Sequence, residues 1–132
     1  MQPPASSRIV YCGMFGTLSR LPLAALLRDG CDVRAVVVPR SSAAGRDEST
    51  RELAPPPGWT ARPASFAALQ RQTIVDLAWE RGIPVLEVAR FDDAALGAIA
   101  RHTPDLIAVS CFPLLFPPAL LALPPRGVLN LH

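Results

Sequence analysis

The sequence predicts an α/β fold of the doubly wound kind, with helices on both faces of a mostly parallel sheet. Short runs rich in β-branched residues alternate along the chain with segments of helical periodicity. Glycine or proline stands at most of the junctions, and the run Val33 to Val38 is apolar except at Arg34, as expected of a strand buried on both faces. Strands that alternate with helices pair in parallel through right-handed crossovers.

About five strands are expected in this sheet. Arg8 to Cys12 (RIVYC) precedes the glycines of a turn, and the run that starts at Val33 ends at Pro39. Gly82 and Pro104 separate the later strands from the helices before them. The predicted strands are residues 8–12, 33–38, 84–88, 105–110 and 128–131. The expected architecture is a Rossmann-like sheet.

Helices are predicted between these strands. The first starts between Ser19 and Leu21, because Pro22 is tolerated in a first turn, and it ends at Gly30. The last is a short helix entered through proline, over residues 117–121.

Two further helices have side-chain caps at their starts. Ser65 is expected to cap a helix that runs to about Arg81, and Asp92 or Asp93 caps the next one. The apolar face of the Ser65 helix is expected to comprise Phe66, Leu69, Ile74, Leu77 and Ala78. Residues 40–63, rich in Ser, Pro, Gly and Arg, are expected to form a long flexible loop.

Composition limits the classes of function. The 132 residues fit one domain, and the net charge of +2 comes from scattered arginines, which argues against a nucleic-acid-binding stripe. Three widely spaced cysteines and two distant histidines favour reduced thiols and no metal site. No secretory leader and no apolar run of membrane-spanning length are visible, so a soluble, cytoplasmic protein is expected.

Asn130 and His132 are the candidate catalytic residues. They stand two apart on the last predicted strand, so side-chain alternation places both on one face at its carboxyl end. An amide donor beside an imidazole stabilises the oxyanion formed when a nucleophile adds to a carbonyl, and the imidazolium also donates a proton. The spacing alone favours the alternative, a strand-end amide and a terminal histidine with no chemical role.

Two loops at the carboxyl ends of strands are candidate ligand sites. Gly13, Gly16 and Thr17 form a turn that either presents backbone amides to a substrate anion or merely connects strand and helix. The turn lacks the third glycine of the dinucleotide fingerprint. The apolar run Phe112 to Phe116 either holds a flat ring in the crevice or packs beneath a neighbouring helix.

Four segments, in this order, resemble the formyltransferase domain of methionyl-tRNA formyltransferases and their relatives. They read RIVYCGMFGT…LPLAALLRDG, VRAVVVPR…AAGR, LAWERGIPVLEV and TPDLIAVSCFPLLFPPALLALPPRGVLNLH. The last segment is the most specific, because it joins an aspartate-led strand, an aromatic-apolar loop, Leu-Pro-Pro-x-Gly and Asn-Leu-His at the family's spacing. The likeness covers nearly everything from Arg8 to His132.

The resemblance implies a folate-dependent reaction. Asn130 and His132 match the catalytic asparagine and histidine that face the formyl carbonyl of 10-formyltetrahydrofolate. The residues Phe112, Pro113, Leu114 and Leu115 match the contacts of the folate pterin. The implied acceptor is an amine, either methionyl-tRNA or a small amine such as an amino sugar nucleotide, and no metal is implied.

The sequence departs from the family at two places. The first loop reads Gly-Met-Phe-Gly-Thr where the transfer-RNA enzymes usually carry Gly-Thr-Pro-Asp-Phe. In the family a Ser-Leu-Leu-Pro segment and a later aspartate follow the histidine, whereas nothing follows His132 here. Residues 1–132 are therefore expected to form one domain of the formyltransferase N-terminal type, incomplete at its carboxyl end and without useful turnover alone.

A second hypothesis is a binding module without catalysis. Such a chain would keep a folate- or nucleotide-binding crevice, and its exposed edge strand and apolar loop would let it pair with another chain or form a homo-oligomer.

Overall fold

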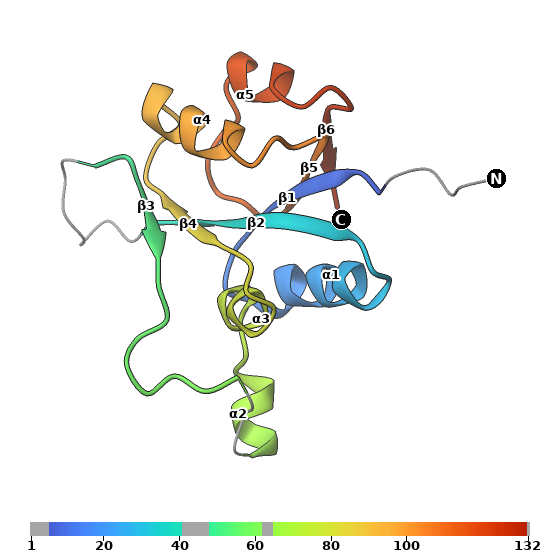
Figure 1. The fold of residues 1–132 in the computed structure, drawn as a ribbon, viewed down its shortest axis with the longest axis vertical. Helices are drawn as coiled ribbons and strands as arrows, with labels where there is room; N and C mark the ends of the chain where they lie inside the picture. The colour runs from blue at the N-terminus through green and yellow to red at the C-terminus, as the bar shows by residue number, and fades with distance from the viewer. Residues whose placement is uncertain (1–5, 41–47, 62–64, 132) are drawn as a thin grey trace.

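A computed structural model describes residues 6–40, 48–61 and 65–131, and within them it shows a six-stranded sheet (Figure 1). The strand order is β3-β4-β2-β1-β5-β6, and each pair is parallel except β3 with β4. The strands are β1 (Arg8–Gly13), β2 (Asp32–Pro39), β3 (Thr50–Leu53), β4 (Val85–Val88), β5 (Leu106–Ser110) and β6 (Val128–Asn130). The predicted doubly wound, mostly parallel α/β fold is confirmed.

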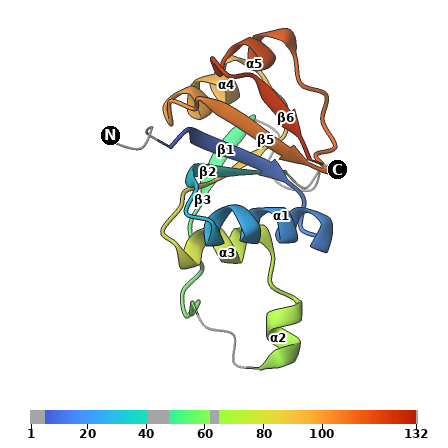
Figure 2. The ribbon, with the colours of Figure 1, turned by 90° about the vertical axis from the view of Figure 1, so that its right-hand side faces the viewer.

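Helices cover both faces of the sheet. Helices α1 and α3 lie on one face and α4 and α5 on the other, while α2 extends away from the sheet (Figures 1 and 2). The helices are α1 (Thr17–Arg28), α2 (Phe66–Gln70), α3 (Ile74–Glu80), α4 (Asp93–Ala100) and α5 (Pro118–Ala122). Asp92 is the N-cap of α4, as predicted, and its Oδ1 accepts from the Ala95 N–H at 3.0 Å.

The strand order reverses between β1 and β5. From β1 the chain proceeds to β2 and β4 on one side, and it then returns to form β5 and β6 on the other. In open parallel sheets the crevice for ligands lies at the carboxyl ends of the strands that flank such a reversal. The ends of β1 and β5, at Gly13 and Ser110, therefore mark the expected position of a site.

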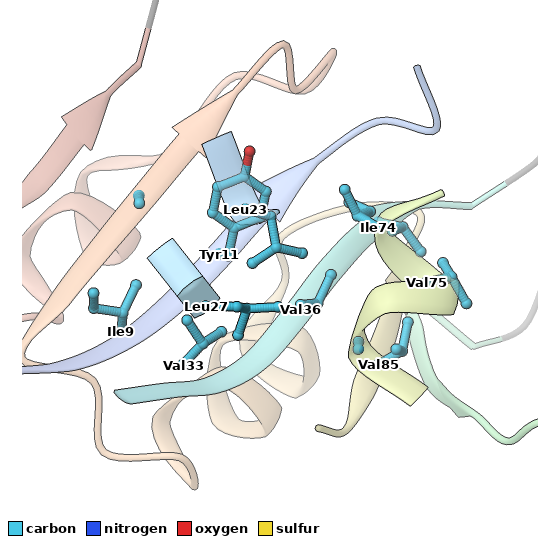
Figure 3. Close-up of a cluster of buried hydrophobic side chains, with 12 residues drawn as sticks. Ile9, Tyr11, Leu23, Leu27, Val33, Val36, Ile74, Val75 and Val85 are labelled. Carbon is cyan, nitrogen blue, oxygen red and sulfur yellow. The ribbon is translucent and has the colours of Figure 1, made fainter. Parts of the chain in front are cut away.

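Two hydrophobic clusters, one on each face of the sheet, hold the helices against it. There are two because neighbouring residues of each central strand point to opposite faces. On the α1 and α3 face, Tyr11 of β1 packs with Leu23 of α1 and Ile74 of α3, all with no exposed surface (Figure 3). On the other face, Val10 and Ile107 pack with helices α4 and α5. The first cluster thus holds α1 against β1, which pairs directly with β5.

Residues 40–63, expected to be a loop, contain a strand. β3 pairs antiparallel with β4, and Arg51 lies opposite Glu87, with its Nε 2.6 Å from a carboxylate oxygen. The indole N–H of Trp79 donates to the Leu53 carbonyl at 3.1 Å. The backbone groups along the edge of β4 need hydrogen-bond partners, and β3 supplies them. Residues 41–47 and 62–64 lie outside the described residues.

The single helix expected from Ser65 to about Arg81 is two helices. Ser65 caps α2 as predicted, since its Oγ accepts from the Ala68 N–H at 3.1 Å. The helix then stops, and Thr73 begins α3 with a capping box, in which its Oγ1 accepts from the Asp76 N–H and the Asp76 carboxylate accepts from its N–H. The expected common apolar face does not form, because Ile74 is buried while Phe66 is 72% exposed.

Helix α1 begins earlier than predicted. It starts at Thr17 after the N-cap Gly16, so Pro22 lies inside the helix rather than in its first turn. Gly30 follows the helix with a φ of 78°, a left-handed conformation that glycine adopts without strain.

Candidate functional site

Two adjoining hollows lie at the carboxyl ends of β5 and β6. The first, about 370 Å³, opens between α1 and the strand ends, and we call it the helix-side hollow. The second, about 350 Å³, opens beneath the loop after β5, and we call it the loop-side hollow. The helix-side hollow is lined by Leu18, Pro22, Val109, Ser110, Cys111, Phe112, Asn130 and Leu131. The loop-side hollow is lined by Val109, Phe112, Leu114, Leu115, Phe116, Leu121, Val128 and Asn130.

Asn130 belongs to both hollows and is exposed. It is the last residue of β6 and lies opposite Val109 in the parallel register with β5. The strand is held by hydrogen bonds from Ile107 N to the Gly127 carbonyl at 3.1 Å and from Leu131 N to the Val109 carbonyl at 2.7 Å. The amide of Asn130 is therefore carried by a fixed strand end. His132 lies outside the described residues, so its pairing with Asn130 stays a prediction.

The apolar loop after β5 packs against the core and also lines the loop-side hollow. Phe91, Phe112 and Phe116 form a ring cluster with centroid distances of 5.1 to 5.9 Å, and Phe112, Leu114 and Phe116 pack against the core on the α4 and α5 face. Leu115 points outward and is 95% exposed at the loop-side hollow. Pro113 is exposed and, among the described residues, is not part of the lining of either hollow.

The glycine turn does not contribute to the lining of the two hollows among the described residues. Of the described residues, Gly13, Gly16 and Thr17 line neither hollow, whereas the next residue, Leu18, does. Gly13 has a packing role, because a Cβ there would lie 3.0 Å from Ser19 Oγ and 3.1 Å from Ile74 Cδ1. The expected contact of this turn with a substrate stays a prediction.

Ser19 and Ser110 form a buried hydrogen-bond network that sequence reasoning missed. Ser19 Oγ donates to the Ser110 carbonyl and Ser110 Oγ donates to the Leu18 carbonyl, both at 2.8 Å. The Tyr11 hydroxyl donates to the Ser19 carbonyl at 2.6 Å, and burial raises the pKa of Tyr11 to about 12, so the hydroxyl remains a neutral donor. The network joins β1, α1 and β5 directly behind the helix-side hollow.

Cys111 lies in the lining of the helix-side hollow as an exposed free thiol. Its φ is 57°, a left-handed conformation that costs energy for a residue with a Cβ. Cys12 and Cys31 are also free, and burial raises the pKa of the Cys12 thiol.

Within the described residues, no three His, Cys, Asp or Glu side chains are grouped to hold a metal ion. None of the described helices is both long and apolar enough to span a membrane.

Comparison with known proteins shows which proteins this chain resembles. No protein-family model matches the sequence. The chain is similar to methionyl-tRNA formyltransferases. It is 32% identical to that of Paenarthrobacter aurescens over 110 residues, which are 83% of this chain and 30% of the relative. It is also 32% identical to that of Dehalococcoides mccartyi strain CBDB1 over 126 residues, which are 95% of this chain and 34% of the relative.

A further relative, the methionyl-tRNA formyltransferase of Renibacterium salmoninarum, is 32% identical over 110 residues. The chain thus spans about a third of the length of the curated relatives it matches. The similarity extends over most of this chain.

Proposed function

We propose that this chain carries the formyl-donor site of a folate-dependent formyltransferase, which moves a formyl group from 10-formyltetrahydrofolate to an amine. One observation supports the proposal above all: Asn130 lies at a fixed strand end between two hollows, on the strand next to β5, which flanks the reversal of strand order. A donor that lies between two adjoining hollows is placed to contact a group passed from a molecule in one to a molecule in the other. The similarity to methionyl-tRNA formyltransferases agrees with this chemistry.

The proposed reaction needs a hydrogen-bond donor at the formyl oxygen. The acceptor amine attacks the formyl carbon, and the carbonyl oxygen becomes an oxyanion in the tetrahedral intermediate. An N–H of Asn130 stabilises this oxyanion, together with the imidazolium of His132. The bond from the formyl carbon to N10 of the folate then breaks, N10 takes up a proton, and the acceptor nitrogen loses one.

The loop-side hollow is the proposed place for the pterin ring of the folate. Its lining is apolar apart from Asn130, and Leu115 is free to pack on a flat ring. The ring cluster of Phe91, Phe112 and Phe116 keeps this wall in place. The acceptor is proposed to be methionyl-tRNA or a small amine such as an amino sugar nucleotide. The proposed location is the cytoplasm, and the free thiols of Cys31 and Cys111 agree with it.

The decisive experiment is a calorimetric titration with 10-formylfolate, a stable oxidised relative of the proposed donor. We expect a dissociation constant below millimolar, with NMR shifts confined to the Asn130 side-chain amide and the residues of the two hollows. NAD serves as the control, because the alternative of a nucleotide-binding module predicts that NAD binds instead. No binding of 10-formylfolate at millimolar concentration contradicts the proposal.

A formyl-transfer assay with methionyl-tRNA and with an amino sugar nucleotide then separates enzyme from binding module. We expect residues 1–132 alone to bind the donor without useful turnover. Sedimentation at several protein concentrations tests the proposed homo-oligomer, for which the exposed Leu115 and Leu129 offer apolar surface.

A further inference from the structure

Pro22 leaves a gap in the hydrogen bonds of α1. In an α-helix the N–H of each residue bonds to the carbonyl four residues earlier, and proline has no N–H to donate. Pro22 lies inside α1, so the carbonyl of Leu18 cannot accept the usual helix hydrogen bond from the N–H of position 22. This carbonyl belongs to the residue that lines the helix-side hollow from the α1 side.

Ser110 supplies the missing donor from another element. Its Oγ donates to the Leu18 carbonyl at 2.8 Å, and its own carbonyl accepts from Ser19 Oγ at 2.8 Å. Ser19 Oγ in turn accepts from the Met14 N–H at 2.9 Å. Ser110 is 2% exposed and Ser19 1%, so water does not compete for these bonds. We call the two 2.8 Å bonds the serine clasp.

The serine clasp connects the opposite walls of the helix-side hollow. Leu18 and Pro22 form the wall on α1, while Ser110, Cys111 and Phe112 form the wall at the end of β5. Figure 2 shows α1 beneath the ends of β1 and β5. Because a wall residue of α1 is bonded to a wall residue of β5, the width of the hollow beside Asn130 depends on these bonds.

We propose that Ser110 and Ser19 are positioning residues whose clasp, in place of the hydrogen bond that Pro22 cannot make, fixes the width of the helix-side hollow. The identity of the ligand rests on the proposed function, whereas the mechanical claim rests on the hydrogen bonds alone. In this proposal neither serine hydroxyl bonds to the ligand, because both donate to backbone carbonyls; each acts through Leu18 and through the turn at Cys111. A serine that only stabilises the fold would lower the unfolding midpoint without changing the affinity of the folded protein.

A double-mutant cycle between Ser110 and Pro22 tests the proposal. Asn130 lines both hollows and is the proposed donor to the formyl group, so a change in the width of the helix-side hollow alters this contact. We therefore expect Ser110→Ala to weaken 10-formylfolate binding about threefold to tenfold, the equivalent of one hydrogen bond. In Pro22→Ala, the new N–H at position 22 satisfies the Leu18 carbonyl, so adding Ser110→Ala should then change the affinity by less than about twofold. Equal effects of Ser110→Ala in both backgrounds, or none in either, overturn the proposal.

Ser49→Ala is the matched control. Ser49 is also a buried serine, 3% exposed, and its Oγ bonds to Asp92 Oδ1 at 2.5 Å, but it lines neither hollow among the described residues. It should lower stability and leave the affinity for 10-formylfolate unchanged. A loss of affinity in Ser49→Ala as large as in Ser110→Ala would show a general effect of lost stability and overturn the proposal.

Alkylation of Cys111 by iodoacetamide provides a readout that needs no ligand. In a Cys31→Ser background the remaining thiols are Cys111, which is exposed, and Cys12, which is fully buried. Opening of the clasp should raise the labelling rate of Cys111 several-fold in Ser110→Ala, and Pro22→Ala should restore it. If wild-type protein does not bind 10-formylfolate, the proposed function fails, and an unchanged labelling rate would separately overturn the clasp.

Failure of Ser110→Ala to fold would also be informative. The Pro22→Ala/Ser110→Ala double variant should then recover folded protein, because Leu18 regains its backbone partner. A double variant that unfolds as readily as Ser110→Ala overturns the proposal.

Discussion

Asp105 accepts three hydrogen bonds from Arg8. The backbone N–H of Arg8 and its Nε reach Oδ2 at 2.8 and 3.2 Å, and Nη2 reaches Oδ1 at 3.0 Å. The Asp105 N–H returns a bond to the Arg8 carbonyl at 2.8 Å. These contacts join the amino ends of β1 and β5, while Ser19 and Ser110 join α1 to the carboxyl end of β5. The strand pair that flanks the site is thus fixed at both ends.

Asp105 makes stability depend on pH in the acid range. Its hydrogen bonds from Arg8 lower the pKa of the carboxyl from 3.8 to about 2. Because the pKa is lower in the folded state, this contribution to stability is fully present above pH about 4 and is lost as pH falls towards 2. In Asp105→Asn we expect a smaller drop in the urea midpoint between pH 5 and pH 2.5, which circular dichroism measures.

Asp29→Asn is the control for that change. Asp29 lies 4.0 Å from Arg28, and both side chains are more than 70% exposed, so the pair should contribute little. Its pH profile should follow that of the wild type. An Asp105→Asn profile that also matches the wild type would contradict the role given to the Arg8 contacts.

Gly13 should not tolerate a methyl group. An added Cβ would lie 3.0 Å from both Cβ and Oγ of Ser19, so Gly13→Ala should destabilise the protein by about 1–3 kcal/mol. Gly97 is exposed within α4, and an added Cβ there would have no atom within 4 Å, so a methyl group should be tolerated at this position. Gly97→Ala should stabilise by about 0.5–1 kcal/mol. Urea unfolding of both variants measures the difference, and equal effects would refute the close approach of Ser19.

The sequence was sufficient to place Asn130 but not to find the serine clasp. Parallel strands end at a common edge, so a residue at the end of β6 was expected at the same edge as the end of β5, and the structure shows the two strands paired. Ser110 and Leu18, by contrast, are 92 positions apart, and no local pattern links two such residues. Pro22 inside a helical segment was the available signal, because it leaves a carbonyl that needs a partner.

Two local errors have different physical causes. β3 has little apolar patterning, and it forms because the edge of β4 offers backbone partners and Glu87 offers a charge to Arg51. The break before α3 was readable in principle, since Thr73 and Asp76 have the spacing of a capping box. The helical periodicity on either side of the break concealed it.

The side-chain cap of Thr73 on α3 should therefore contribute to the free energy of unfolding. Thr73→Ala removes the acceptor of the Asp76 N–H and should cost about 1 kcal/mol of unfolding free energy. Thr73→Ser keeps the hydroxyl and should stay close to the wild type. Urea midpoints compare the two, and an equal loss in both variants would show that the hydroxyl is not the source of the effect.

Leu115 gives the sharpest test of the loop-side hollow. It is 95% exposed, so Leu115→Ser should leave the unfolding midpoint unchanged, yet a pterin ring packed on it would lose apolar contact. Because the variant loses the favourable burial of a leucine side chain against the ligand, its affinity for 10-formylfolate should fall about tenfold. Leu69→Ser on α2, also exposed but outside both hollows among the described residues, should not change the affinity. Calorimetry compares Leu115→Ser with the wild type. If the wild type binds 10-formylfolate and Leu115→Ser binds it equally well, the ring does not pack on Leu115, and the helix-side hollow becomes its alternative position.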